Sequence, residues 1–175
     1  MNLFKRTAVA GLALCALASC SGGSTSSSQD TSAAIPQCDV DADASCQDVI
    51  FESANFSGKD LSGIDFRHAH LVGANFSKAN LTQANFYGAD VAGANFEDAI
   101  LVRASFDGAK MDGANMGHTR LSGANFKKAE LVNADFIGAF ATDANFSGAT
   151  GNDKLTGAFL CKTTMPNGEV AGGSC

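Results

Sequence analysis

The chain has 175 residues, a formal net charge of −6 at pH 7, 45% hydrophobic residues and 17% charged residues. With 18 acidic residues against 12 lysines and arginines, the composition gives no support to nucleic-acid binding through a positive patch.

Residues 1–19 are predicted to be a signal peptide. Lys5 and Arg6 precede an apolar run over 7–18, which is too short to span a membrane and is typical of a secretory signal. Residues 17–20 read Leu-Ala-Ser-Cys, which resembles the bacterial lipobox. This resemblance implies cleavage before Cys20 and attachment of lipid to that cysteine. A plain secretory signal with an incidental cysteine is the alternative.

Two neighbouring residues bear on this interpretation. Cys15 is a poorer lipidation site than Cys20, because Leu14 stands where a small residue is expected. Ser21 follows Cys20, whereas Asp at that place is the inner-membrane retention signal of some Gram-negative bacteria. We therefore expect anchoring in the outer membrane, facing the periplasm, by a lipid that does not span the bilayer.

Residues 20–37 are rich in Ser, Gly and Thr and are predicted to form a flexible linker. Residues 38–50 are expected to cap the N-terminal end of the domain that follows. Within this cap, 39–43 alternate Asp with Val and Ala, like the start of a calcium-binding loop. Ala44 stands where that loop needs Gly, and Ile50 where it needs a bidentate Glu. A solvated acidic segment is preferred, and calcium binding there is left open.

Residues 51–160 repeat a five-residue phrase, read most clearly as Ala-Asn-Phe plus two polar residues at 54–58, 74–78 and 94–98. A helix has an apolar period of 3.6 residues and a strand alternates, so a period of five fits neither. A period of five fits a coil in which one small and one large side chain of each five-residue unit point inward. The remaining Gly, Asn, Asp and other polar residues then lie at the turns.

The large inward residues alternate between Phe and Leu, Val or Met, which makes the full period ten residues. Phe stacks on Phe in successive turns only if each turn holds an even number of fives. Two fives are too few to enclose a Phe ring, and four give a square of twenty residues. The sequence therefore predicts two opposite columns of stacked Phe, which begin at Phe56 and Phe66.

The phrase resembles the signature of pentapeptide-repeat proteins, Ala-Asp/Asn-Leu/Phe followed by two loosely specified residues, over 51–160. This resemblance implies an all-β fold, a right-handed quadrilateral β-helix. Coils at strand spacing would make a solenoid of five to six coils, about 25 Å long, with capped ends. Residues 161–175 are expected to form the C-terminal cap, with Pro166-Asn167-Gly168 as a turn.

Four cysteines remain after Cys15 and Cys20 are set aside, and an even number in an exported protein indicates disulfides. Two lie before the array and two after it. We expect local bridges at the two ends, and disfavour a zinc site because the pairs lie far apart. The expected pairs are Cys38–Cys46 and Cys161–Cys175.

No catalytic residue, metal site or cofactor is expected. An enzyme needs titratable groups that converge in a concavity, and a coil filled by Ala and Phe has none in evidence. His68 and His70 lie together on one turn, whereas His118 is half a coil out of phase with His68, on the opposite face.

The resemblance also implies an alternative function, because quinolone-resistance members of this family are acidic rods that mimic DNA and bind gyrase. Over 51–160 there are 12 acidic and 9 basic residues, a net charge of only −3. An exported lipoprotein would also never meet gyrase. A DNA-mimic binder of a topoisomerase is therefore the less favoured interpretation.

Three apolar residues point to a contact surface. Ile100 and Val102 flank Leu101 on one face, and Phe140 lies two coils further along that face at an outward position. Coverage of Phe140 by the C-terminal cap or by a locally altered coil is the alternative and is slightly preferred. The sequence as a whole predicts a lipid-anchored, non-enzymatic structural or protein-interaction scaffold, whose partners are the membrane, through Cys20, and an unidentified envelope protein.

Overall fold

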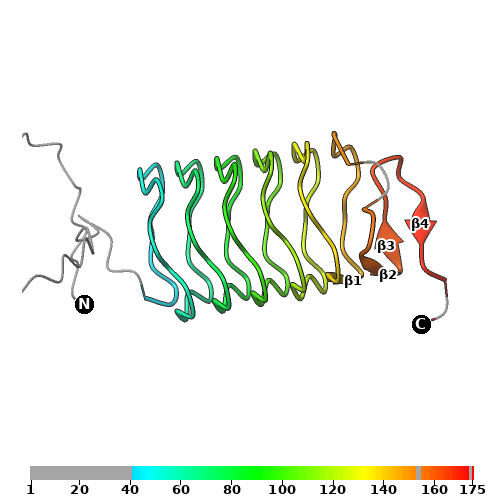
Figure 1. The fold of residues 1–175 in the computed structure, drawn as a ribbon, viewed down its shortest axis with the longest axis horizontal. Helices are drawn as coiled ribbons and strands as arrows, with labels where there is room; N and C mark the ends of the chain where they lie inside the picture. The colour runs from blue at the N-terminus through cyan, green and yellow to red at the C-terminus, as the bar shows by residue number, and fades with distance from the viewer. Residues whose placement is uncertain (1–40, 153–154, 174) are drawn as a thin grey trace, which may run out of the picture. The chain divides into compact units, whose positions relative to one another are not determined.

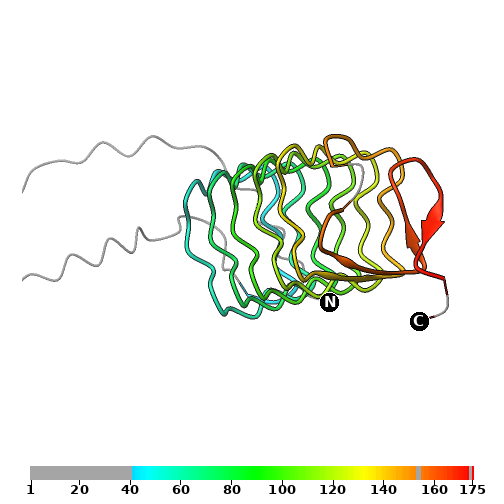
Figure 2. The same ribbon diagram turned by 45° about the vertical axis from the view of Figure 1, so that its right-hand side comes forward.

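The computed structural model describes residues 41–152, 155–173 and 175, which belong to one compact unit, Ala33–Cys175. The backbone of this unit winds into coils stacked along a single axis (Figure 1). The same stack is seen after a turn of 45° (Figure 2). The fold is the predicted right-handed quadrilateral β-helix.

Four short strands lie at the C-terminal end: β1 (Phe140–Thr142), β2 (Phe159–Cys161), β3 (Thr163–Thr164) and β4 (Val170–Ala171). Strand β1 pairs with β2 in parallel, and β3 pairs with β4 antiparallel. Elsewhere in the described coils, neighbouring turns are joined by single-residue parallel bridges.

These bridges confirm the four-sided turn of twenty residues. Asn55 pairs with Asn75, and Asn75 pairs with Asn95. The same spacing of twenty residues holds along each of the four faces. The longest ladder has seven levels and therefore six full turns, which agrees with the upper end of the expected five to six coils. Its members are Ser45, Asp65, Asn85, Ser105, Asn125, Asn145 and Thr164.

The five-residue phrase has a direct backbone explanation. At each corner, the N–H of the small residue donates to the carbonyl oxygen of the large residue three positions earlier, as Ala74 N–H does to Leu71 at 3.0 Å. The second corner residue lies in the left-handed region, for example Gly73 (φ 66°), Lys78 (φ 60°) and Asp98 (φ 59°). Gly and short polar residues tolerate this conformation best, which is why they recur there.

The Asn of the phrase closes the corner. The Oδ1 atom of Asn95 accepts a hydrogen bond of 3.0 Å from the backbone N–H of Glu97, and Asn75 does the same for Ser77. This Asx turn satisfies a backbone donor on the outer surface of the coil, where no neighbouring coil supplies an acceptor.

Replacing Asn95 with Ala is expected to lower the free energy of unfolding by about 0.5–1.5 kcal/mol, because the bond to Glu97 N–H is lost. Chemical denaturation followed by circular dichroism measures this change. Asn95→Asp is the matched control, since Asp90 makes the same contact to Ala92 N–H elsewhere in the coil. Equal destabilisation by both substitutions would show that the Oδ1 acceptor has no such role.

The two predicted Phe columns form the aromatic part of the core, beside buried Ala and aliphatic side chains. Within a column the rings stack face to face, with centroids 4.7 Å apart for Phe86–Phe106 and 5.0 Å for Phe106–Phe126. Between columns the rings meet edge to face, as Phe96 and Phe106 do at 5.6 Å and 90°. The opposite faces therefore contact each other directly, and these rings are fully buried.

One coil departs from the phrase in two linked places. Met116 occupies a Phe position and Thr119 an Ala position, and both side chains are fully buried. The Thr119 hydroxyl donates to the backbone carbonyl of Met116 at 2.6 Å. The buried Thr is thus satisfied within its own corner, and the flexible Met fills its place in the column.

The coil begins earlier than the sequence analysis expected. Residues 41–50, assigned to an N-terminal cap, already follow the coil pattern: Ser45 pairs with Asp65, and Ile50 with His70. Cys46 is buried at a position equivalent to that of Phe66. The boundary at Phe51 was therefore wrong for the described part of the cap.

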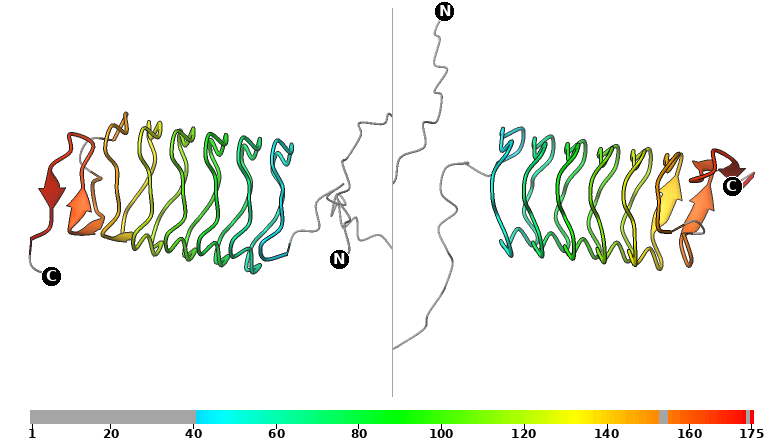
Figure 3. Two further views of the ribbon diagram at one scale, coloured as in Figure 1. Left: turned by 180° about the vertical axis from the view of Figure 1, so that it is seen from behind. Right: turned by 90° about the horizontal axis from the view of Figure 1, so that it is seen from above.

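At the C-terminal end the period shortens to 19 residues, so that Phe140 pairs with Phe159 and Asn145 with Thr164. The coil thus continues through Cys161 to Thr164, beyond the expected boundary at 160. Strands β3 and β4 then form a hairpin around the turn at 165–168, as the sequence predicted (Figure 3).

Candidate functional site

The face centred on Leu101 has a distinct outward column. Successive bridges stack six outward residues in a line along the coil axis, each level one coil further on. The column changes from polar at its N-terminal end to apolar and cationic at its C-terminal end. Its members are Asp60, Asn80, Ile100, Arg120, Phe140 and Phe159.

Phe140 and Phe159 are the exposed apolar residues of this column. Their rings stack at 5.0 Å with an interplanar angle of 16°, and 50% of Phe140 and 60% of Phe159 remain exposed. The expected coverage of Phe140 by the C-terminal cap or a locally altered coil is only partial: Phe159 of the shortened last coil stacks on the Phe140 ring and leaves half of this residue exposed. Ile100 and Val102 lie on the same face but are half-buried.

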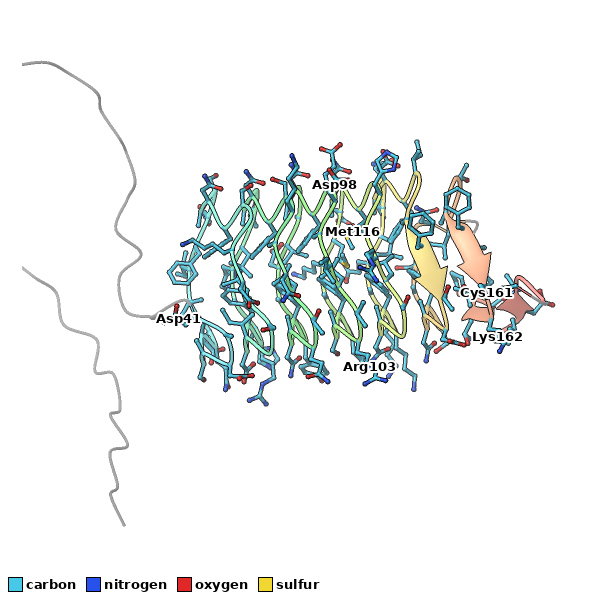
Figure 4. The ribbon with its side chains drawn as sticks, turned by 90° about the horizontal axis from the view of Figure 1, so that it is seen from below. Asp41, Asp98, Arg103, Met116, Cys161 and Lys162 are labelled. Carbon is cyan, nitrogen blue, oxygen red and sulfur yellow. A yellow bond between two sulfur atoms is a disulfide. The ribbon has the colours of Figure 1, made fainter. Side chains whose placement is uncertain are left out.

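Phe159 was not among the residues predicted for the contact surface. The signal was present, because the one-residue shortening before Leu160 brings Phe159 into the outward position next to Phe140. Figure 4 shows the side chains of this face, with Asp98 at one edge and Arg103 at the opposite edge.

The ionisable side chains are spread over the surface of the described coils. His68 packs edge-on against Tyr87 with ring centroids 5.4 Å apart, and His118 lies half a coil out of phase on the opposite face. His70, Asp90 and Lys110 follow one another in a mixed surface ladder. In the part of the chain that the structure describes, no three His, Cys, Asp or Glu side chains gather closely enough to hold a metal ion.

An ion pair lies within the second coil, on the face centred on Phe66, and a hydrogen bond from Gln47 joins it to the first coil. The Arg67 guanidinium lies 2.8 Å from the Asp65 carboxylate, which also accepts a bond of 2.7 Å from Gln47. Partial burial acts to raise the pKa of Asp65. The hydrogen bonds and charge of Arg67, with the bond from Gln47, outweigh that effect and hold the pKa below its ordinary value of 3.8.

Because the pKa of Asp65 is lowered on folding, its contribution to stability is present above pH 3.8 and is lost as the pH falls through the folded-state pKa. At pH 7, Asp65→Asn should be less stable than the wild type by under about 1 kcal/mol, since the pair is partly exposed. Thermal unfolding at pH 7 and well below pH 3.8 measures the difference. A difference that does not shrink in acid would contradict this assignment.

The cysteines divide between described and undescribed residues. Cys161 and Cys175 form a disulfide with their Cα atoms 5.9 Å apart, which ties the chain end to β2. Cys46 is also disulfide-bonded. Cys38, the lipidation candidate Cys20 and residues 39–40 of the acidic segment 39–43 lie outside the described residues. Among the residues that are described, no helix is long and apolar enough to cross a membrane.

Residues 60–98, 92–127 and 129–153 match the family model described as pentapeptide repeats, in eight copies. These segments cover more than half of the chain, which therefore belongs to the pentapeptide-repeat family. Members of this family are generally structural or interaction proteins. A search of curated proteins found no match.

Several solved structures are similar. A pentapeptide repeat protein from the Arabidopsis thaliana thylakoid lumen is 36% identical, with a TM-score of 0.53 over 54% of this chain and 66% of its own. HetL from Nostoc, involved in heterocyst differentiation regulation, is 26% identical, with a TM-score of 0.44 over 73% of this chain and 52% of its own. This chain thus covers less than two thirds of either protein. QnrB1, a plasmid-mediated fluoroquinolone resistance protein, is 25% identical, with a TM-score of 0.30 over 69% of this chain and 68% of its own.

Proposed function

We propose that this protein is a lipid-anchored, non-enzymatic scaffold of the bacterial cell envelope, with a rigid coil that contacts other envelope components. The lipobox-like residues 17–20 support attachment through Cys20, and Ser21 supports the outer membrane, facing the periplasm. The disulfides at Cys46 and Cys161 support an oxidising compartment. The thylakoid-lumen source of the Arabidopsis protein also supports a role outside the cytoplasm.

The observation that carries the proposal is an exposed aromatic pair, Phe140 and Phe159, on a coil whose interior is filled. A filled interior leaves the outer faces to carry the function. Those faces are mostly polar, so adjacent exposed Phe rings mark a contact surface. We assign Ile100, Val102 and Phe140 to this surface, as the sequence suggested, and add Phe159.

Cross-linking in intact cells, followed by isolation of the membranes, tests the proposal. An amine-reactive reagent can capture a protein partner through Lys110 or Lys127, which are exposed on faces other than the one centred on Leu101. We expect wild-type protein in the membrane fraction with a reproducible set of cross-linked envelope proteins. Cys20→Ala is the control, and should lose both the membrane location and the cross-links. Cross-links to gyrase in the cytoplasm would instead support the DNA-mimic alternative and overturn the proposal.

A further inference from the structure

The C-terminal half of the face centred on Leu101 combines apolar and cationic groups, and we call it the apolar–cationic patch. Phe140 and Phe159 provide its exposed rings, and three exposed bases lie around them. The full patch consists of Ile100, Val102, Arg103, Arg120, Phe140, Phe159 and Lys162.

The charge of this face is uneven. The patch carries three bases. Asp143 is exposed in the column that holds two of these bases, and Asp98 lies at the opposite edge, so the bases outnumber the two acids by one. Asp43 and Asp60 occupy the N-terminal end of the same face. A chain with a net charge of −6 therefore keeps a local excess of positive charge beside its exposed Phe pair.

We propose that the patch lies on the anionic phospholipid surface of the membrane that holds the lipid on Cys20; this inference rests on the proposed anchoring. Lys and Arg side chains are attracted to anionic headgroups, and aromatic side chains enter the interface between headgroups and acyl chains. Phe140 and Phe159 present their stacked rings to that interface, and Arg120 is the next residue in the same column.

The chain between the anchor and the coil is long enough for this contact. The 20 residues 21–40 can span at most about 70 Å. The five steps from Asp60 to Phe159 cover about 24 Å at ordinary strand spacing. The far end of the face can therefore reach the same bilayer, and the coil would lie along the membrane with its C-terminal end closest.

The size of the patch also favours a membrane over a protein. The patch spans the three steps from Ile100 to Phe159, about 14 Å, and is one face wide, about 10 Å, so it offers about 140 Å². A stable protein interface needs about 800 Å² from each partner. A weak lipid contact is sufficient here, because the anchor already holds the coil near the bilayer.

The absence of Trp from the sequence allows a direct test. The full lipidated protein carrying Phe159→Trp is added to preformed vesicles that contain brominated lipids, with or without phosphatidylglycerol in phosphatidylcholine. Val132→Trp is the matched control, because Val132 is 46% exposed on the opposite face. Thermal unfolding checks that both variants keep the coil.

In anionic vesicles, we expect the fluorescence of the Phe159→Trp protein to shift to the blue and to be quenched at least about twofold more than that of the Val132→Trp protein. Neutral vesicles should reduce this difference. Adding Arg103→Glu, Arg120→Glu and Lys162→Glu to the Phe159→Trp protein should abolish it while leaving the protein bound to the vesicles through its lipid.

Equal quenching of both reporters on vesicles that do bind the protein would overturn the patch inference and leave the anchor intact. A blue shift without quenching, which disappears as the protein is diluted on the vesicle surface, would assign the patch to a second copy of the chain and overturn the inference. A chain without lipid on Cys20, shown by mass spectrometry of the same preparation, would instead overturn the anchor and the inference with it.

Discussion

Replacing Phe106 with Ala is expected to lower the free energy of unfolding by about 3–5 kcal/mol. Phe106 is fully buried between Phe86 and Phe126, and it also meets Phe96 edge to face. Removal of the ring leaves a cavity that the surrounding coils cannot close, because each coil is fixed by backbone hydrogen bonds to both neighbours. Urea denaturation followed by circular dichroism measures the loss.

The matched control for this substitution is Phe140→Ala. The Phe140 ring is half exposed, so its removal should cost under about 1 kcal/mol. Similar losses for the two substitutions would contradict the assignment of Phe106 to the core and Phe140 to the surface.

Loss of the Cys161–Cys175 disulfide should have the next largest effect. The bridge closes a loop with a sequence separation of 14, for which chain entropy predicts about 3 kcal/mol of stabilisation. The affected structure is the last coil and its hairpin, where Lys162 N–H donates to the Gly172 carbonyl and Gly148 N–H to that of Pro166. In Cys175→Ser, the amides of both donors should exchange with solvent faster than in the wild type.

Hydrogen exchange also supplies an internal control. Each coil contacts only its neighbours, so amides several coils away, such as Phe76 N–H, should keep their protection in Cys175→Ser. Uniform loss of protection along the coil would show that the bridge stabilises the whole fold cooperatively. Unchanged exchange at Lys162 would show that the hairpin does not depend on the bridge.

The architecture could be predicted because each side chain type has a separate place in the phrase. The alternation of Phe and Leu predicted a coil with four faces of five residues each. The stacking of Phe86 on Phe106 follows from this period of twenty residues. Gly and polar residues at the fourth and fifth places of the phrase matched corners that require a left-handed residue, as at Gly73 and Lys78.

The ends of the coil were harder to predict, because backbone pairing continues where the side-chain phrase weakens. The first three places of the phrase are small, polar and large apolar, and at the N-terminal end they are filled by Ala44, Ser45 and Cys46 instead of Ala-Asn-Phe. Ser45 nevertheless pairs with Asp65 of the next coil. A coil needs hydrogen-bond partners in the next coil more than it needs Phe at every centre.

The exposed Phe pair was predicted only in part. The outward position of Phe140 followed from the period, but its exposure depended on the path of the chain after the last coil. The one-residue shortening places Phe159 beside Phe140, and the hairpin leaves both rings partly exposed. Such an outcome depends on tertiary contacts between β2 and the hairpin, which the period does not specify.

The central claim is that the coil is held at a membrane by lipid on Cys20. Mass spectrometry of the N-terminal peptide of the mature protein, isolated from its host, tests it most directly. We predict that the mature chain begins at Cys20 and that this residue carries a diacylglyceryl group on its sulfur. A mature chain that begins at another residue, or an unmodified Cys20, would contradict the claim.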